Sequence, residues 1–127
     1  MSVLVDSSVW IEYFRSTLEH RELDILIQED LVVVNDLILA ELIPALHLRR
    51  QRKLIALMKE IARPPLAIDW NDIIQMQILC LRNGINQVGI PDLIIAQHAI
   101  QNGLALYSQD KHFLLLARHI PLVLHCE

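Results

Sequence analysis

Four acidic residues, each set beside an apolar segment, are the side chains of this sequence best suited to chemistry: Asp6, Glu41, Asp92 and Asp110. If the fold brings them together, their carboxylates repel one another and raise one another's pKa values. A divalent cation removes that penalty, and an oxygen-rich site without histidine suits Mg²⁺ or Mn²⁺. Such an ion polarises a phosphoryl oxygen and lowers the pKa of bound water, as phosphodiester hydrolysis requires.

Each acid also has a structural explanation when it is taken alone. Asp6 and Asp110 could cap helices, and Asp92, directly after Pro91, could complement the dipole of a first helical turn. Glu41 lies among apolar neighbours in NDLILAEL, so we expect it to be buried and to need an arginine or a metal as partner. The acids point to a metal site only if the fold gathers them.

Length and composition predict one domain, residues 1–127, of a cytoplasmic protein. A chain of 127 residues, 54% of them hydrophobic, can build a core without disulfides. Cys80 and Cys126 lack metal-binding or redox spacing, and we interpret them as reduced thiols. The N-terminus has no basic signal-peptide segment, and the apolar window 31–48 contains two acids, an asparagine and a proline, which are costly in lipid.

The charge balance does not indicate a general nucleic-acid binder. Fifteen acidic residues against eleven basic ones give a net charge of −4. One dense basic run breaks this pattern, at Arg49, Arg50, Arg52 and Lys53. Such a run is usually a solvated helix face, but it could also bind RNA phosphates locally.

Short β-branched segments alternate with helical patterns along the whole chain. We predict five strands, at residues 2–5, 31–34, 65–68, 104–108 and 121–126. Helices are expected between them, at residues 9–15, 18–28, 37–48, 54–62, 70–83, 91–102 and 109–119, with a kink or break at Pro44. This alternation predicts an α/β fold with a mainly parallel sheet covered on both faces.

The predicted sheet places two of the acids at one edge. Ligands of parallel sheets bind beyond the carboxyl ends of the strands, and Asp6 ends the first strand while Asp110 follows the fourth. Asp92 opens the helix that leads into the fourth strand, and the spacing alone does not place it at that edge.

Four segments in this order resemble the signature blocks of PIN-domain ribonucleases, and most closely those of the VapC toxins of toxin–antitoxin pairs. The segments are DSSVWIEYFR (6–15), NDLILAEL (35–42), IPDLIIAQHA (90–99) and LYSQDKHF (106–113). The resemblance spans nearly the whole chain. It implies a three-layer α/β/α sandwich with a central five-stranded sheet, and hydrolysis of RNA in the cytoplasm.

The resemblance also assigns the metal ligands. In this family three acids bind Mg²⁺ or Mn²⁺: one ends the first strand, one lies in the helix after the second strand, and one is the aspartate of the PDLIIA-like block. Asp6, Glu41 and Asp92 match these three positions. A further family acid matches Asp110. Ser108 stands where the family more often has threonine, and either hydroxyl can hydrogen-bond a carboxylate or water.

Partners follow from the same resemblance. VapC-like toxins bind a VapB-like antitoxin in a groove between the first helix and the helices after the second strand, and they are commonly homodimers. Trp10, Tyr13 and Phe14 would then line that groove, although packing in the core also explains them. The six histidines lack metal-binding spacing and are interpreted as packing or surface residues; His112, close to Asp110, is the one nearest to the expected site.

Two other functions are compatible with the pattern. One is a catalytically silent PIN fold that serves only as an interaction module. The other is a phosphorylation-receiver domain, with Asp69 as acceptor after a third strand and Ser108 as the hydroxyl after a fourth. A receiver also needs a second acid beside Asp6 and a lysine after the last strand, and the sequence has neither. Metal-dependent cleavage of RNA separates these functions from a nuclease.

Overall fold

The protein was analysed as a computed structural model, which describes residues 1–15 and 20–125. The strands are β1 (Val3–Val5), β2 (Val32–Val33), β3 (Ala105–Tyr107) and β4 (Val123–Leu124). The helices are α1 (Ser7–Arg15), α2 (Arg21–Gln28), α3 (Asp36–Leu48), α4 (Arg52–Glu60), α5 (Trp70–Arg82), α6 (Ile90–Gln101) and α7 (His112–Ala117). The ends of two predicted elements, the helix from residue 18 and the strand to residue 126, lie outside the described residues.

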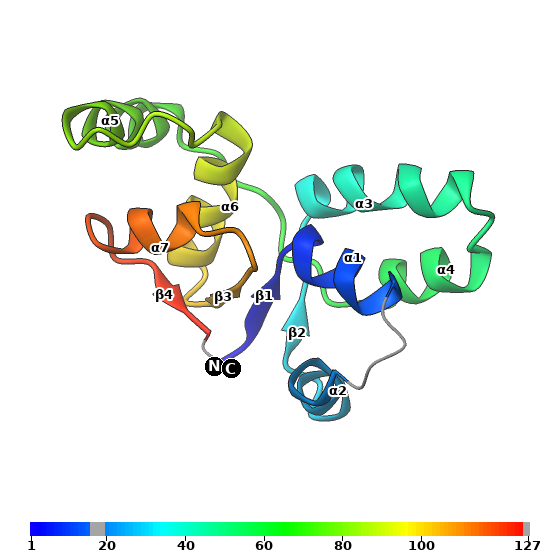
Figure 1. The fold of residues 1–127 in the computed structure, drawn as a ribbon. Coiled ribbons are helices and arrows are strands. Elements are labelled where there is room, and N and C mark those ends of the chain that lie inside the picture. The colour runs from blue at the N-terminus through cyan, green and yellow to red at the C-terminus, as the bar shows by residue number, and fades with distance from the viewer. Residues whose placement is uncertain (16–19, 126–127) are drawn as a thin grey trace.

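The four strands form one parallel sheet in the order β2-β1-β3-β4. The middle strands β1 and β3 pair in register, with Val3 opposite Ala105 and Val5 opposite Tyr107. Both are fully buried, as expected for strands covered on two faces. Because all the strands run the same way, their carboxyl ends share one edge of the sheet (Figure 1).

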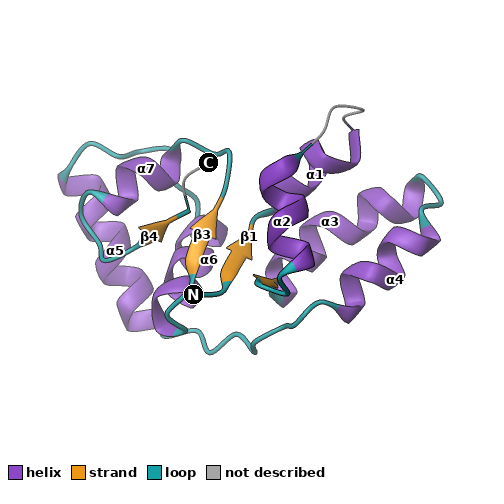
Figure 2. Cartoon of the chain, turned by 90° about the horizontal axis from the view of Figure 1, so that it is seen from below, coloured by secondary structure: helices purple, strands orange, loops and turns teal. Residues whose placement is uncertain are grey.

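The helices cover the sheet on both sides, which gives the predicted three-layer arrangement. Figures 1 and 2 show α3 and α4 side by side at one end of the molecule and α5, α6 and α7 grouped at the other. The core lies between these groups and the sheet, and its most deeply buried side chains come from strands and helices alike, such as Leu4, Ile38, Leu93 and Leu106. Among the described helices, none has the length and apolarity needed to cross a membrane.

The strand predicted at residues 65–68 does not form, so the sheet has four strands and not five. Prolines at 64 and 65 remove two backbone donors from this segment. Its carbonyls instead accept hydrogen bonds from side chains of α6: Gln101 Nε2 donates to Ala67 O at 3.0 Å, and His98 Nε2 lies 3.1 Å from Pro64 O. The segment is therefore an extended link bound to a helix.

Local signals place the helix ends largely where the sequence predicts them. Asn35 and Asp69 cap α3 and α5, each accepting a hydrogen bond from the backbone N–H three residues later. Gly84 follows α5 with φ +69°, the left-handed conformation that glycine adopts readily. Pro44 lies inside α3 but does not split it, because the helix runs unbroken from Asp36 to Leu48.

Candidate metal centre

Asp6 lies at the carboxyl edge of the sheet, directly after β1, and is buried with 6% exposure. Its backbone joins the sheet to α1, since its N–H donates to Tyr107 O and its carbonyl accepts from Val9 N. Its carboxylate oxygen Oδ2 accepts hydrogen bonds from two hydroxyls, Ser8 Oγ at 2.8 Å and Ser108 Oγ at 2.9 Å. These bonds fix the orientation of the carboxylate.

Asp110 lies at the same edge, in the loop between β3 and α7. The loop is tied to the Asp6 region, because Asp110 N donates to Ser108 Oγ at 3.0 Å and Gln109 N donates to Ser8 Oγ at 3.1 Å. Asp110 Oδ1 accepts from the backbone N–H of His112 at 2.9 Å. Asp110 thus binds a backbone N–H at the start of α7, as the sequence suggested. Its other carboxylate oxygen, Oδ2, remains available to face the other acids.

The start of α6 brings Asp92 to this edge as well. A helix that leads into a parallel strand runs back along the sheet, so α6 begins near the carboxyl ends of the strands. Asp92 Oδ2 accepts a hydrogen bond from Gly89 N at 3.2 Å. The pKa of the Asp92 carboxyl is raised, first by burial and then by the charges of Asp110 and Asp6, although the Gly89 hydrogen bond and the charge of His112 act in the opposite direction.

Glu41 is exposed, so the prediction that it is a buried carboxylate is wrong. Helical periodicity explains the difference, because the buried residues of α3 are Ile38, Leu39, Leu42 and Leu46, and Glu41 points away from them. The pKa of Glu41 is nevertheless raised, first by partial burial and then by the charges of Asp6 and Asp92. Glu41 therefore faces the same region as those two acids.

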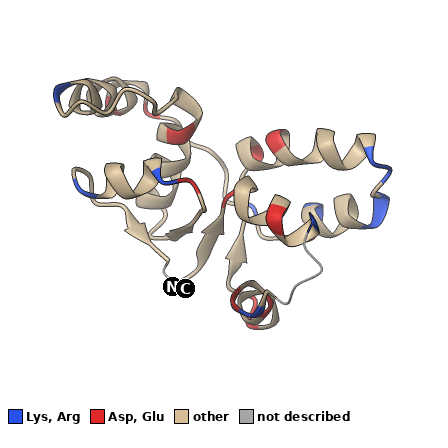
Figure 3. Ribbon diagram, in the orientation of Figure 1, with Lys and Arg blue, Asp and Glu red and all other residues tan. Residues whose placement is uncertain are grey.

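The four acids form a cluster of negative charge. Among the described residues, no lysine or arginine forms an ion pair with any of the four. Figure 3 shows acidic segments near the middle of the molecule and basic segments at the turn between α3 and α4. Charges of this cluster contribute to the raised pKa values of Glu41 and Asp92. The carboxylates provide the oxygen donors that Mg²⁺ and Mn²⁺ bind, so the donor set fits such an ion.

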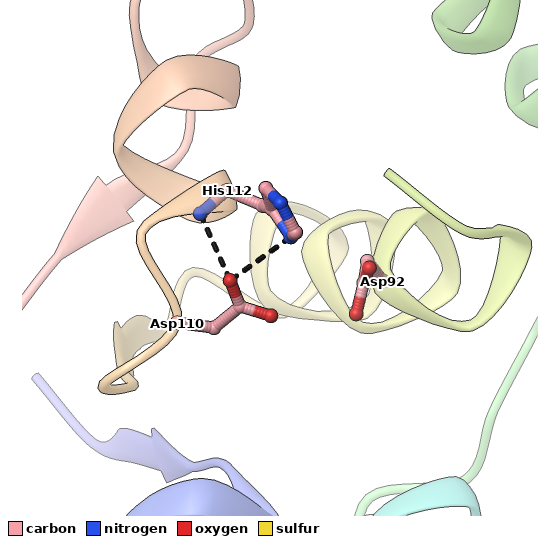
Figure 4. Close-up of side chains that lie close together, drawn as sticks. All are labelled: Asp92, Asp110 and His112. Carbon is pink, nitrogen blue, oxygen red and sulfur yellow. Dashed lines mark hydrogen bonds and ion pairs between the residues drawn. The ribbon is translucent and has the colours of Figure 1, made fainter. Parts of the chain in front are cut away.

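Asp92, Asp110 and His112 come closest together. One potential ligand atom of each lies within 4.8 Å of those of the other two. Figure 4 shows Asp92 on its helix facing Asp110, with the His112 ring beside both. His112 Nδ1 lies 3.0 Å from Asp110 Oδ1.

The sequence did not indicate two contributions to this site. One is Ser8, whose hydroxyl supports the Asp6 carboxylate together with that of Ser108. His112 was noted for its proximity to Asp110, but its contact with the acids depends on the turn that starts α7. No residue spacing encodes that turn in a recognisable form.

A separate apolar groove of about 430 Å³ lies between α1 and α4. Its walls include Trp10, Tyr13 and Phe14 from α1 and Leu54, Leu57 and Met58 from α4, with Asp30 and Glu60 among the lining residues. The Trp10 ring stacks on Phe14 with centroids 5.8 Å apart, and its Nε1 is buried without a hydrogen-bond partner among the residues that the structure describes. Trp10 is thus a core residue and a groove residue at once.

The fold and the acidic edge define a PIN domain, and the family comparison agrees. The family model of the PIN domain matches residues 3–118, so this chain belongs to that family. The receiver alternative fails on this finding and on local structure, because Asp69 caps α5 and residues 61–68, directly before it, form no strand of the sheet.

Several solved structures share this fold. A chain of VapBC2 from Rickettsia felis, bound to a promoter DNA fragment, matches with 17% identity and a TM-score of 0.78, and the match covers 98% of both chains. A chain of the DNA-bound VapBC of Salmonella typhimurium matches with 18% identity and a TM-score of 0.73, covering 98% of this chain and 96% of the other. One of FitAcB from Neisseria gonorrhoeae gives 24% identity and a TM-score of 0.68, with 97% and 96% covered. A comparison with curated protein sequences found no significant match.

Proposed function

We propose that this PIN domain, residues 1–127, is a Mg²⁺- or Mn²⁺-dependent endoribonuclease and the toxin of a VapBC-type pair, acting in the cytoplasm. The observation that carries the proposal is the gathering of four acids at one edge of the sheet. Partial burial raises the pKa values of Glu41 and Asp92, and neighbouring acids add to the effect: Asp6 and Asp92 for Glu41, Asp110 and Asp6 for Asp92. PIN domains are generally nucleases, which supports the same activity.

Each acid has a role in this proposal. Asp6, Glu41, Asp92 and Asp110 hold the cation, directly or through water, with Ser108 and Ser8 fixing the Asp6 carboxylate. The bound cation would polarise the scissile phosphate and lower the pKa of a water molecule. The acids come from a strand end, two helices and a loop. The free energy of folding therefore offsets the repulsion between their charges before the cation binds.

Replacement of the helix-start acid tests the proposal. Asp92→Asn keeps an oxygen for the Gly89 N–H and should fold, but it should abolish cleavage of an RNA panel measured on sequencing gels. EDTA should stop the wild-type enzyme, and Mn²⁺ but not Ca²⁺ should restore it, because Ca²⁺ prefers longer bonds and higher coordination numbers. Full activity of Asp92→Asn, or cutting that persists in chelator, contradicts the assignment. A silent interaction module would instead leave RNA intact with every metal.

We further propose that a VapB-like antitoxin occupies the groove between α1 and α4. The apolar walls of the groove favour a partner that brings apolar side chains. Leu57 lines the groove and is 58% exposed, so Leu57→Asp should leave the fold intact. Leu114, 57% exposed on α7, provides the matched control Leu114→Asp.

Co-purification with the product of the reading frame just upstream tests this surface. The tagged wild type and Leu114→Asp should retain that product, and Leu57→Asp should lose at least tenfold in retained amount. Equal retention by all three proteins would place the partner elsewhere.

A homodimer is the third part of the proposal. Along α5, Trp70, Ile74, Ile78 and Leu81 are exposed by 58%, 54%, 37% and 62%, and their spacing places them along one face of the helix. Light scattering after size-exclusion chromatography should give twice the chain mass for the wild type and the monomer mass for Ile74→Glu. A monomeric wild type at micromolar concentration would exclude a stable dimer.

A further inference from the structure

A histidine lies among the acids of the candidate metal centre. His112 Nδ1 is 3.0 Å from Asp110 Oδ1, and one ligand atom of His112 lies within 4.8 Å of those of Asp92 and Asp110 (Figure 4). The side chains of His112 and Asp110 are 31% and 34% exposed, so a cation can reach them from solvent.

The distances suit shared coordination. In an octahedral site with bonds of about 2.1 Å, two adjacent ligand atoms lie about 3.0 Å apart and two opposite ones about 4.2 Å apart. The Nδ1–Oδ1 separation of 3.0 Å is that of adjacent ligands. The ligand atoms of Asp92, Asp110 and His112 lie within 4.8 Å of one another, so a small inward movement of the Asp92 side chain would bring all three to coordination distance. That side chain is half-buried and therefore has room to move.

The His112 ring is not needed to orient Asp110. The backbone N–H of His112 already donates to Asp110 Oδ1 at 2.9 Å, so the carboxylate is fixed by the main chain whatever the side chain at this position. A second donor on the same oxygen adds little to its orientation. The lone pair of His112 Nδ1 can instead bind a cation that lies between this nitrogen and the carboxylates.

We propose that His112 Nδ1 is a direct ligand of the cation, so that the centre is a mixed carboxylate–imidazole site that favours Mn²⁺ over Mg²⁺. The inference rests on the proposed metal-dependent function and adds a nitrogen to its all-oxygen ligand set. As a transition-metal ion, Mn²⁺ accepts an imidazole nitrogen more readily than Mg²⁺, which strongly prefers oxygen. For ligation, Nδ1 presents its lone pair and the ring proton resides on Nε2.

Pulsed electron paramagnetic resonance of bound Mn²⁺ reports the nitrogen directly. The wild type should show the echo modulation of a directly bonded imidazole ¹⁴N, and ¹⁵N-labelled histidine should replace that pattern by the ¹⁵N pattern. His112→Gln should lose the modulation and bind Mn²⁺ roughly 10–100-fold more weakly by calorimetry. Its Mg²⁺ affinity should change less than about threefold, since Mg²⁺ draws on the carboxylates and water.

The control is His119→Gln, which alters an exposed histidine just beyond the other end of α7 and should keep both the modulation and the affinity. Asp92→Asn separates the two proposals. If Mn²⁺ binds and Asp92→Asn abolishes binding, but the wild type shows no nitrogen modulation, the histidine ligand is wrong and the acidic centre stands. If Mn²⁺ does not bind, or binds equally to Asp92→Asn, the proposed function itself fails. The ¹⁵N experiment uses unmodified protein, so the inference remains testable even if His112→Gln does not fold.

Discussion

At the scale of single residues, the Asp6 carboxylate shows how the site is held in place. Ser8 and Ser108 each accept a backbone N–H from the loop after β3 and each donate a hydroxyl to the same oxygen of Asp6. The two serines therefore link the orientation of Asp6 to the position of the loop that carries Asp110. Loss of either hydroxyl should affect both acids.

Ser108→Ala and Ser108→Thr form a matched pair for this link. Ser108→Ala should weaken Mn²⁺ binding about 10-fold or more, because a supporting hydrogen bond to a ligand is lost, and should cost about 1 kcal/mol in the free energy of unfolding. Ser108→Thr keeps the hydroxyl and should stay within about twofold of wild type. Calorimetric Mn²⁺ titration and urea denaturation measure the two effects, and equal behaviour of both variants would show that the hydroxyl does not matter.

The raised pKa of Asp92 makes a prediction about stability without metal. Its folded pKa lies above the ordinary 3.8, so the folded protein binds the proton more tightly than the unfolded chain. The stabilising contribution of this group is therefore present below pH 3.8 and is lost as the pH rises through the folded pKa. At pH 7 in EDTA, Asp92→Asn should melt roughly 1–3 °C above wild type.

That difference should shrink towards zero as the pH falls below 3.8, where the Asp92 carboxyl is protonated in both the folded and the unfolded protein. With saturating Mg²⁺ the order should reverse, because only the wild type gains the binding energy of the ion. Melting curves at two pH values, with and without Mg²⁺, test all three statements. A variant that melts below wild type in EDTA at pH 7 would show that the carboxylate stabilises the metal-free fold.

At the scale of elements, two helix caps of the same type should differ in cost. Asn35 is fully buried; it caps α3, and its Nδ2 lies 3.2 Å from His98 Nδ1. His98 Nε2 lies 3.1 Å from Pro64 O, so the hydrogen bonds assign a neutral ring with its proton on Nε2. Burial lowers the pKa of His98 and favours the same neutral form.

Asn35→Ala should therefore lose a cap of about 1 kcal/mol and also leave a buried ring nitrogen unpaired, at a cost of about 1–3 kcal/mol. Asp69→Ala removes an exposed cap on α5 and should cost only about 0.5–1 kcal/mol. Urea denaturation of both variants gives the comparison. Similar costs would mean that the contact between Asn35 and His98 contributes nothing.

The elements also show how much of the fold the sequence could predict. The caps Asn35 and Asp69 and the stop at Gly84 were predictable, because each depends on backbone groups within a few residues. The conformation of residues 65–68 was not predictable, since the Ala67 carbonyl accepts its hydrogen bond from Gln101 of α6, 34 residues away in sequence. An apolar segment of that length reads as a strand until its hydrogen-bond partners are known.

The same reasoning applies to the site. The acids Asp6 and Asp110 were placed correctly at the sheet edge because strand ends are local features and the strands are parallel. The exposure of Glu41 was missed, because apolar neighbours in sequence do not fix which way a helical side chain points. The approach of His112 to the acids depends on one turn after β3 and was only suggested by proximity.

At the scale of the whole molecule, charge is separated along α3. Acids lie at the sheet edge, whereas the basic run lies at the turn between α3 and α4, where His47, Leu48, Arg50, Arg52 and Ile55 line a hollow of about 420 Å³. Glu41 and Arg49 are eight residues apart, which is about 12 Å along the helix. An RNA strand with its scissile phosphate at the acids could therefore reach the basic turn within a few nucleotides, despite the net charge of −4.

The basic turn should carry the salt dependence of RNA binding. In a cleavage-inactive Asp92→Asn background, Arg50→Gln combined with Arg52→Gln should lower the affinity for a short single-stranded RNA at least tenfold at 50 mM salt. The slope of log K against log salt should fall by about 1.4, since each lost phosphate contact on a single strand contributes about 0.7. Arg82→Gln, at the end of α5 in the other helix group, is the control and should change neither quantity. Fluorescence anisotropy from 50 to 300 mM salt gives both numbers, and an unchanged slope in the double variant would mean that the basic turn is only a solvated helix end.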